Sequence, residues 1–350
     1  MSETVVQVKP LDVLEPNKGA EWDRLVRSHP SSNPFHCAAW ARVINQTYGH
    51  EVRYLQFHVG HELVAVIPLI EVVSPITGRR GVCLPFSDAC GPLVFGRGDT
   101  TFIHHELSRL ATERRWDYYE IRDGQRTDAE SADTFYRHWI KLSGESEEVF
   151  GRFTSATKRL IRKVTKTDLN IAVSESAAAM EEFYRLHVRT RRRHGVPPQP
   201  WEFFRHIWEH MIKAGLGFVV LARLGARAVS GAVYFRFGTT AIYKYAASDP
   251  KFRTSGGNNL VMWEAIRQLI TLGITTLDFG RTDLNNEGLR RFKLSWGAEE
   301  QLITYNRFPS RSKQDAAGPG IGSRLSQHVF RRLPLSVNRI VGALAYQHLD

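Results

Sequence analysis

The chain has 350 residues, of which 42% are hydrophobic, so it can bury a sizeable core, and its length favours two domains over one. The formal net charge of +11 predicts attraction to an anionic partner, such as nucleic acid, a phosphate-bearing cofactor or an acidic membrane surface. Three cysteines without a C-x-x-C pair argue against a disulfide framework or a zinc cluster and favour a reducing cytoplasm. The N-terminal stretch carries charges where a signal peptide needs an apolar core, and no later run reaches membrane-spanning length, so we expect a soluble protein.

Three predicted elements occur twice in the same order along the chain. An aromatic-rich helix at residues 33–49 precedes two strands joined by a glycine turn, and a second aromatic-rich helix at residues 197–217 precedes another such pair. In each half a further helix then leads into a strand with an acidic end, at Glu120 and at Asp278. A recurrence at about 160 residues is too long for a solenoid repeat and predicts duplicated domains.

The composition divides the chain into three parts. We predict a first lobe at residues 1–150 and a second lobe at residues 151–308. Residues 309–350 begin as a linker rich in Gly, Pro and Ser and continue as a basic amphipathic tail. The tail either contacts an anionic membrane surface or packs on the first lobe.

Two stretches in the second half are strongly basic. Residues 154–166 predict a helix with cations on one face and apolar side chains on the other, capped by Thr154 or Ser155. A run of arginines ends a second predicted helix. Such charge runs are usually solvated, and together these two are also a candidate phosphate-binding surface. The cations are Lys158, Arg159, Arg162, Lys163 and Lys166 in the first stretch and Arg189, Arg191, Arg192 and Arg193 in the second.

A glycine-rich loop lies between a strand that ends near Ala246 and a helix that begins near Asn258. The loop contains Arg253, Gly256 and Gly257. A glycine loop that opens a helix exposes backbone N–H groups and the positive end of the helix dipole, which together favour a pyrophosphate. The alternative is a tight turn that needs glycine for its backbone conformation alone.

The order of strand, Arg-x-x-Gly-Gly loop, helix and strand resembles the acyl-CoA loop of the GNAT acyltransferase superfamily. That pattern ends in a small residue, and here "RTSGGN" has Asn258 at this place. The later stretches "DFGRT" and "GLRRFKLSWGA", with "SPITGRRGVCLPFSDACGPLVFG" in the first half, resemble the FemAB-like branch, which has two fused GNAT-like lobes. This branch includes aminoacyl-tRNA-dependent transferases that build peptidoglycan cross-bridges and relatives associated with exopolysaccharide loci.

The resemblance implies an α/β fold of two tandem GNAT-like lobes, each a mixed twisted sheet flanked by helices, with the second lobe catalytic. It implies acyl-CoA or aminoacyl-tRNA as the donor co-substrate. Phe292 and Lys293 match a Phe-Lys doublet at the donor site, and the acceptor site would form around Phe86 and Asp88 in the first lobe, with Gly91 nearby. Donor phosphate would be bound by Arg253, Gly256, Gly257 and Asn258.

Direct attack of an amine on the donor is the mechanism that fits the charged residues. No G-x-S-x-G elbow or P-loop lysine motif is present, and no Cys/His spacing requires a covalent intermediate. Lys293 either stabilises the oxyanion or binds a donor phosphate, or it is a solvated surface lysine. Asp278 either helps to take the proton from the amine or is paired structurally with Arg281, whose guanidinium also suits a carboxylate or phosphate. Asp283 is a weaker candidate acid or base.

Two tyrosines complete the candidate donor site. Tyr243 and Tyr245 alternate with Lys244, so we expect them on one face of a strand, where they either line an acyl pocket or pack in the core. The histidines have no metal-ligand spacing, so we expect no metal.

The sequence leads to one function and two alternatives. We expect a transferase, either cytoplasmic or peripheral to the inner membrane, that acylates or aminoacylates an amine of a cell-envelope or exopolysaccharide precursor. One alternative is an RNA-binding module that uses the basic helix without catalysis, and the other is an envelope-biosynthesis scaffold whose donor site has decayed. No long heptad pattern predicts the helical arm of many tRNA-dependent relatives, which slightly favours a small acyl donor.

Overall fold

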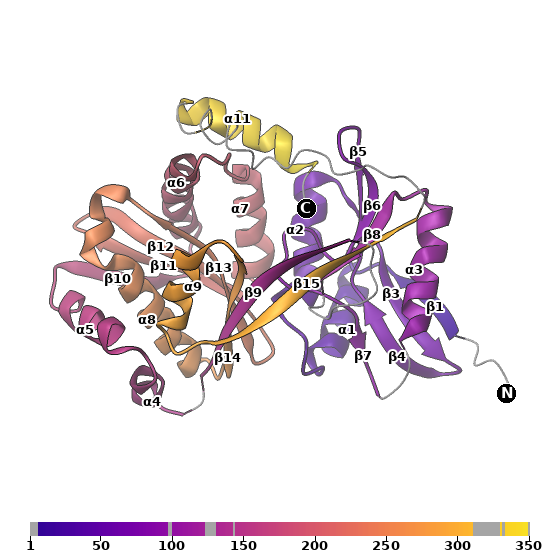
Figure 1. The fold of residues 1–350 in the computed structure, drawn as a ribbon, viewed down its shortest axis with the longest axis horizontal. Coiled ribbons are helices and arrows are strands. Elements are labelled where there is room, and N and C mark those ends of the chain that lie inside the picture. The colour runs from indigo at the N-terminus through magenta and orange to yellow at the C-terminus, as the bar shows by residue number, and fades with distance from the viewer. Residues whose placement is uncertain are drawn as a thin grey trace. The chain divides into compact units, whose positions relative to one another are not determined.

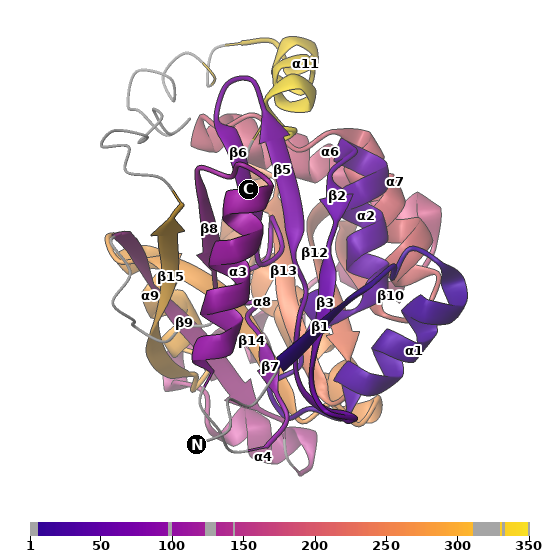
Figure 2. The ribbon, with the colours of Figure 1, turned by 90° about the vertical axis from the view of Figure 1, so that its right-hand side faces the viewer.

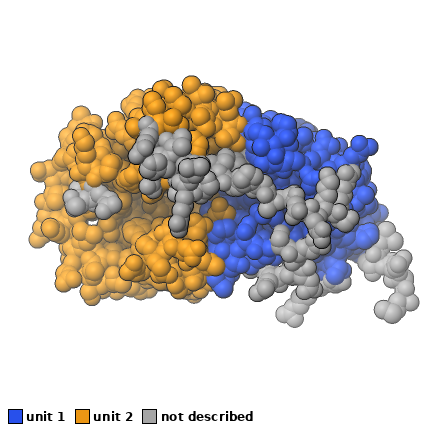
Figure 3. All heavy atoms as spheres, turned by 45° about the horizontal axis from the view of Figure 1, so that its top comes forward, with its two compact units in different colours: residues 1–135, 302–318, 347–350 blue, residues 136–301, 319–346 orange. Residues whose placement is uncertain are grey.

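The computed structural model describes residues 6–96, 100–122, 131–142, 144–310, 330 and 333–348, apart from the side chains of residues 131 and 253–255. The chain forms two compact units, coloured separately in Figure 3. Unit 1 comprises Met1–Phe135, Leu302–Gly318 and Gln347–Asp350, and unit 2 comprises Tyr136–Gln301 and Pro319–Tyr346. Within the described part, no helix has the length and apolar character to cross a membrane.

Unit 1 contains two sets of strands and three α-helices among its described residues. One sheet has the antiparallel order β1-β3-β4-β7. In the other set β5 pairs antiparallel with β2 and β6, and β6 pairs parallel with β8. Helix α3 covers strand β8 (Figure 2). The elements are β1 (Val6–Leu11), α1 (Pro16–Arg27), η1 (Pro34–His36), α2 (Ala38–Tyr48), β2 (Glu51–Val52), β3 (Tyr54–Val59), β4 (Glu62–Ile67), β5 (Ile70–Ser74), β6 (Gly78–Val82), β7 (Leu93–Val94), α3 (Thr101–Glu113) and β8 (Tyr118–Ile121).

Unit 2 is built around the antiparallel order β10-β11-β12-β13, followed by β14 parallel to β13 (Figure 1). The chain passes between the two units within β9 and again within β15. The elements are β9 (Ser131–Lys141), α4 (Ser146–Gly151), α5 (Ser155–Val164), β10 (Leu169–Ser174), α6 (Ala177–His194), α7 (Trp201–Ile207), the π-helix η2 (Trp208–Ile212), β11 (Gly217–Leu224), β12 (Arg227–Phe237), β13 (Thr240–Ser248), η3 (Pro250–Ser255), α8 (Gly257–Thr271), β14 (Thr276–Asp283), α9 (Glu287–Leu294), β15 (Glu299–Pro309) and α11 (Leu335–Tyr346).

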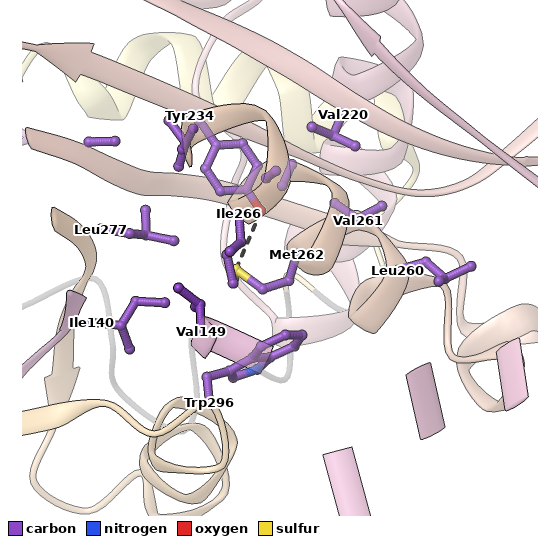
Figure 4. Close-up of a cluster of buried hydrophobic side chains, with 14 of the residues drawn as sticks. Ile140, Val149, Val220, Tyr234, Leu260, Val261, Met262, Ile266, Leu277 and Trp296 are labelled. Atoms are coloured by element: carbon purple, nitrogen blue, oxygen red, sulfur yellow. Dashed lines mark hydrogen bonds between the residues drawn. The ribbon is translucent and has the colours of Figure 1, made fainter. Parts of the chain in front are cut away.

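The main core of unit 2 lies between α8 and one face of the sheet (Figure 4). Tyr234 of β12 donates its hydroxyl to the sulfur of Met262 on α8, 3.6 Å away, and both side chains are fully buried. Trp296 closes this core from the segment after α9. Burying side chains of this size contributes about 1.5–3 kcal/mol each, so this core fixes α8 against the strands.

The opposite face of the same sheet is covered by α6 and α7. A Cβ on Gly231 of β12 would lie only 2.6 Å from Cδ2 of Leu221 on the neighbouring strand β11, with the ring of Phe183 on α6 in van der Waals contact at 3.4 Å. His187 of α6 is buried here, its ring 4.8 Å from that of Phe204 and its Nε2 2.9 Å from Oε1 of Gln199. Burial lowers the pKa of His187 from 6.5 to about 3.

The buried His187 predicts a loss of stability in acid. Because its pKa is lower in the folded state, the unfolded chain binds the proton more readily between pH 6.5 and about 3. The free energy of unfolding should therefore fall with pH across this window, by about 1.4 kcal/mol per pH unit for this one group. Urea unfolding at several pH values gives the free energy of unfolding as a function of pH. This dependence on pH should be weaker in His187→Phe and unchanged in the exposed control His105→Gln. An equal slope in His187→Phe and wild type would contradict this assignment.

The two predicted basic stretches have different environments. Helix α5 begins at Ser155 with Thr154 as its N-cap. Its cations Arg159, Arg162 and Lys163 are exposed, whereas Ile161 and Val164 are buried, so the predicted amphipathic helix is confirmed. Lys158 is half-buried and donates to the carbonyl of Gly151. The arginines at the end of α6 are held in the structure: Arg193 donates to the carbonyl of Ser248, and Arg191 contacts α11. The solvated interpretation is therefore wrong for these two arginines, because α6 ends against other backbone segments.

Candidate functional site

The parallel strands β13 and β14 part at one end of unit 2. Their pairing spans Thr240–Ile242 and Thr276–Asp278, and both strands continue beyond it. The continuation of β13 leads through η3 to the glycine loop, and that of β14 carries the charged residues of the predicted site. Backbone groups that leave a ladder need other partners, such as side chains, water or a ligand. The site is therefore built from the diverging strand ends and the first turn of α8.

The glycine loop ends in a left-handed residue at the start of α8. Gly256 has φ +71° and is the N-cap of α8, and both it and Gly257 are buried. The amides of a first helical turn have no partner within the helix, so they favour an anion. Asn258 is exposed, and its side-chain oxygen accepts a hydrogen bond from the hydroxyl of Ser230. The side chain of Arg253 lies outside the described residues.

Basic helix α5 packs directly on this loop. A Cβ on Gly256 would lie 2.3 Å from Cγ2 of Val164 and 3.4 Å from Cδ1 of Leu160. The apolar side of α5 therefore faces the start of α8, while Arg159 and Lys163 of the same helix are exposed. This packing places a positively charged surface beside the candidate anion site.

Alanine at Gly256 should destabilise unit 2 and disturb the anion site. The substitution combines a positive φ with a close approach to Val164, so we expect a loss of about 1–3 kcal/mol. Gly288→Ala is a matched control, because nothing lies closer than 4.0 Å to the added Cβ in the first turn of α9. Thermal unfolding of both variants checks this, and equal melting temperatures for Gly256→Ala and wild type would refute the role of the loop conformation.

Asp278 is a buried carboxylate with two described partners. Its side chain is only 6% exposed and forms an ion pair with Arg137 of β9, with Nε and Oδ2 2.5 Å apart. Its other oxygen accepts the backbone N–H of Gly280 at 2.7 Å. Asp278 therefore orients the backbone at the end of β14. The sequence suggested Arg281 as its partner, whereas the described ion pair is with Arg137, which is 141 positions away in the chain and carries no motif of its own.

Lys293 is buried, although a lysine in a charged helix usually extends into solvent. Only 2% of the residue is exposed, and its ammonium donates to the carbonyls of Gly280 and Arg281 at 2.8 and 2.9 Å. The interpretation of Lys293 as a solvated surface lysine is therefore wrong, because α9 turns it towards the end of β14. Asp278 and Lys293 hold opposite polar groups of the same short backbone segment.

A buried histidine joins this cluster without a motif in the sequence. His138 of β9 is fully buried, and its Nε2 lies 2.8 Å from a carboxylate oxygen of Glu300. Burial lowers the pKa of His138, and the positive charge of Lys293 acts in the same direction. Arg290 of α9 bonds to both oxygens of Glu300 and holds the pKa of that carboxyl below its usual value. Because 162 positions separate His138 from Glu300, only the fold brings them together.

The other predicted donor-site residues divide between surface and core. Arg281 and Asp283 are exposed on β14. Phe292 of α9 is half-buried against the core, its ring centroid 6.1 Å from that of Trp296. The Phe-Lys doublet thus combines an apolar contact with a buried cation on one helix.

The prediction that the two tyrosines share a strand face is wrong. Tyr243 lies opposite Tyr234 and Tyr245 opposite Val233, so β13 has one extra residue at Lys244. This β-bulge breaks the alternation of side chains. Tyr243 packs on the α8 side, 5.4 Å from the ring of Tyr234, and Tyr245 packs 5.2 Å from Phe204 of α7.

In unit 1 the predicted acceptor residues lie on one loop. Phe86 has φ +60° and packs on Tyr48, with ring centroids 5.1 Å apart. Asp88 is half-buried, and its carbonyl accepts the hydroxyl of Tyr305 at 2.7 Å. Gly91 accepts from the ring of His36 through its carbonyl.

A cluster of ion pairs contacts the backbone at the start of this loop. Arg122 donates to the carbonyl of Leu84 and pairs with the fully buried Glu120 at 2.6 Å, and Arg307 of β15 pairs with the other oxygen of Glu120 at 2.7 Å. The acidic strand end at Glu120 is thus structural in this unit. Asp123, which follows it, lies outside the described residues.

The comparisons agree with this architecture. Residues 151–298 match the family model described as "Acetyltransferase (GNAT) domain". No curated protein matches the chain in sequence. Among the described residues, no group of three or more His, Cys, Asp and Glu side chains is placed to hold a metal ion.

Several solved structures share the fold at low sequence identity. A crystal structure of FemX is 14% identical and has a TM-score of 0.70, covering 87% of this chain and 97% of that one. A tandem GNAT protein from the clavulanic acid biosynthesis pathway is 10% identical, with a TM-score of 0.57 and coverages of 89% and 100%. L-PGS from Bacillus licheniformis is 11% identical, with a TM-score of 0.54 and coverages of 94% and 97%.

These matches confirm the predicted architecture of two GNAT-like lobes. At such identities the likeness concerns the fold alone. Residues 151–298 therefore match an acetyltransferase (GNAT) domain in sequence, within a chain that has the fold of FemX and of the tandem GNAT protein.

Proposed function

We propose that the chain transfers an acyl or aminoacyl group to an amine of a cell-envelope or exopolysaccharide precursor. The observation that carries the proposal is the parting of β13 and β14 beside the start of α8, with Lys293 and Asp278 holding the end of β14. A donor would place its phosphates at the first turn of α8 and its acyl group between the diverging strands. The GNAT domain match agrees with this use of unit 2.

The reaction would be a direct transfer. The amine nitrogen forms a bond to the acyl carbon, the carbon–sulfur or carbon–oxygen bond to the donor breaks, and the amine proton passes through water to the leaving group or to a carboxylate. Asp278 has both oxygens engaged, so it would act on this proton through water. Lys293 would place its positive charge behind the Gly280–Arg281 backbone and favour the developing oxyanion.

Thermal unfolding with candidate donors tests this proposal. A donor that binds only the folded chain stabilises it by about 2.7 kcal/mol at a concentration one hundred times its Kd. We expect acetyl-CoA, another acyl-CoA or an aminoacyl-tRNA to raise the melting temperature, and Gly256→Ala to reduce the shift. The proposal would be refuted if none of these donors changed the melting temperature of the wild-type chain.

A second candidate function is RNA binding without catalysis. The exposed cations of α5, with no acidic residue among residues 155–166, favour it. In that case binding of arbitrary RNA would weaken with salt and show no preference for charged over uncharged tRNA. A chain that bound RNA in this way and bound no acyl donor would support this alternative. Failure to bind either donor or RNA would favour the third possibility, a scaffold with a decayed donor site.

A further inference from the structure

Helix α11 carries a row of exposed apolar side chains. Val337, Ile340 and Leu344 are 38%, 62% and 62% exposed, and their spacing puts them on one side of the helix. Large side chains with this exposure in a regular row are unusual on a soluble surface, where single exposed apolar residues are the norm. The row therefore calls for an apolar partner.

The other side of α11 is fixed to unit 2, so the apolar row cannot turn inward. A Cβ on Gly342 would lie 1.9 Å from the carbonyl oxygen of Pro198, which means that the helix backbone lies directly on this segment. Tyr346 is buried, donates its hydroxyl to the carbonyl of Pro197 and accepts a hydrogen bond from Arg191 of α6. In Figure 1 α11 runs along the outer edge of unit 2, above α6. The row is thus presented outward by a firmly held helix.

A groove beside α11 extends this apolar surface. It has a volume of about 320 Å³ and is lined on the α11 side by Ile340 and Ala343, with Ser336, and on the other side by Pro200 and Trp201, with the carboxylate of Glu202. Arg339 closes one part of it, with its guanidinium 5.6 Å from the centre of the Tyr184 ring. Tryptophan and arginine beside aliphatic side chains are the residue types that favour the boundary between lipid and water.

The charge of the supporting helix indicates which apolar partner fits. Residues 185–194 of α6 contain five arginines and no carboxylate. The side chains of Arg185 and Arg189 are 67% and 48% exposed, and they pair with Glu181 and Asp249, so the surface keeps an excess of arginines over these carboxylates. Arg339 adds a positive charge on α11 itself. Basic groups near a membrane surface are attracted to anionic lipids, and apolar side chains alone would not discriminate in this way.

We propose that α11 and the adjacent groove dock unit 2 reversibly onto an anionic lipid bilayer. Val337, Ile340 and Leu344 would enter the boundary between head groups and acyl chains, with Trp201 at the same boundary. The arginines of α6 would strengthen binding by electrostatic attraction to the anionic lipid head groups. This inference does not depend on the proposed transferase activity.

Vesicle flotation with the full chain tests the docking. The probes are vesicles of phosphatidylglycerol mixed with phosphatidylcholine and vesicles of phosphatidylcholine alone. We expect wild type to float with the anionic vesicles and poorly with the neutral ones. Ile340→Glu combined with Leu344→Glu should weaken this partitioning by at least about tenfold, since two apolar side chains leave the lipid and two negative charges face it.

Controls separate docking from loss of folding. Leu224→Glu is the matched control, because Leu224 is 42% exposed on β11 of the same unit and should leave flotation unchanged. Ile340→Ser with Leu344→Ser gives a milder change at the same two sites. Melting temperatures within a few degrees of wild type establish that the variants are folded. Quenching of tryptophan fluorescence by brominated lipid should decrease in Trp201→Phe.

The outcomes distinguish docking from its rivals. Wild type that stays unbound with anionic vesicles, or a glutamate variant that floats like wild type, overturns the proposal. It is also overturned if sedimentation shows a wild-type dimer that the glutamate variant converts to a monomer without any change in flotation, because the row would then be an interface between two copies. Transfer to a soluble amine should be the same in wild type and the glutamate variant, so failure of docking is distinct from failure of the transferase proposal.

Discussion

Replacing Lys293 with methionine is expected to lower transfer activity by at least about a hundredfold and to destabilise unit 2 by about 2–5 kcal/mol. The side chain is buried, and its loss leaves the carbonyls of Gly280 and Arg281 without the donor that they have now. Methionine fills a similar volume, so the changes in activity and stability reflect the loss of the ammonium group and not a loss of packing. Activity on the identified donor and acceptor, with thermal unfolding, checks both expectations.

Two further variants show which property of Lys293 matters. Lys293→Gln keeps a hydrogen-bond donor but removes the charge. If this variant is as stable as wild type but inactive, the positive charge of Lys293 is required for the transfer reaction. Arg291→Met removes a cation from the exposed side of the same helix and should change neither quantity by much. If Lys293→Met retained full activity and stability, the residue would have no role in the site.

Asp278→Asn is expected to have the second largest effect. The substitution leaves Arg137 without its carboxylate partner and weakens the bond to the N–H of Gly280. Because the Arg137 side chain is 27% exposed, we expect a loss of about 2–4 kcal/mol, less than for a fully buried pair. Activity should fall with it, since the end of β14 loses its orientation.

A double-mutant cycle measures this coupling directly. Arg137→Gln combined with Asp278→Asn should cost about 1–3 kcal/mol less than the sum of the two single changes. Asp168→Asn removes an exposed carboxylate from the same unit and should change stability by no more than about 0.5 kcal/mol. Additive effects of the two single substitutions would show that the ion pair contributes nothing in solution.

The sequence predicted those elements whose pattern is local. The 3.6-residue period and a cap at Thr154 or Ser155 were sufficient to predict α5, for which the structure selects Thr154 as the cap, and the duplicated order of helices and strands indicated the two lobes. The glycine loop before α8 was recognisable because its residue types carry a backbone requirement that Gly256 fulfils with a positive φ. Features of this kind depend only on residues that are close in the sequence.

The contacts that build the site were not predictable in the same way. Arg137 and His138 lie on β9 with no motif, and their partners are 141 and 162 positions away. The burial of Lys293 depends on how α9 packs on β14, which no pattern within the "FKLSW" stretch reveals. The predicted partner of Asp278 was its sequence neighbour, whereas folding placed Arg137 beside it.

The extra residue in β13 affects how deletions should act on this gene. Because Lys244 is the extra residue of the bulge, losing its codon would restore strict alternation along the strand. Tyr245 would then have to leave its contact with Phe204, or every later residue of β13 would have to change register with β12. We therefore expect that deletion of this residue is tolerated far less well than its substitution. The bulge determines which side chains of β13 face α8 and which face α7.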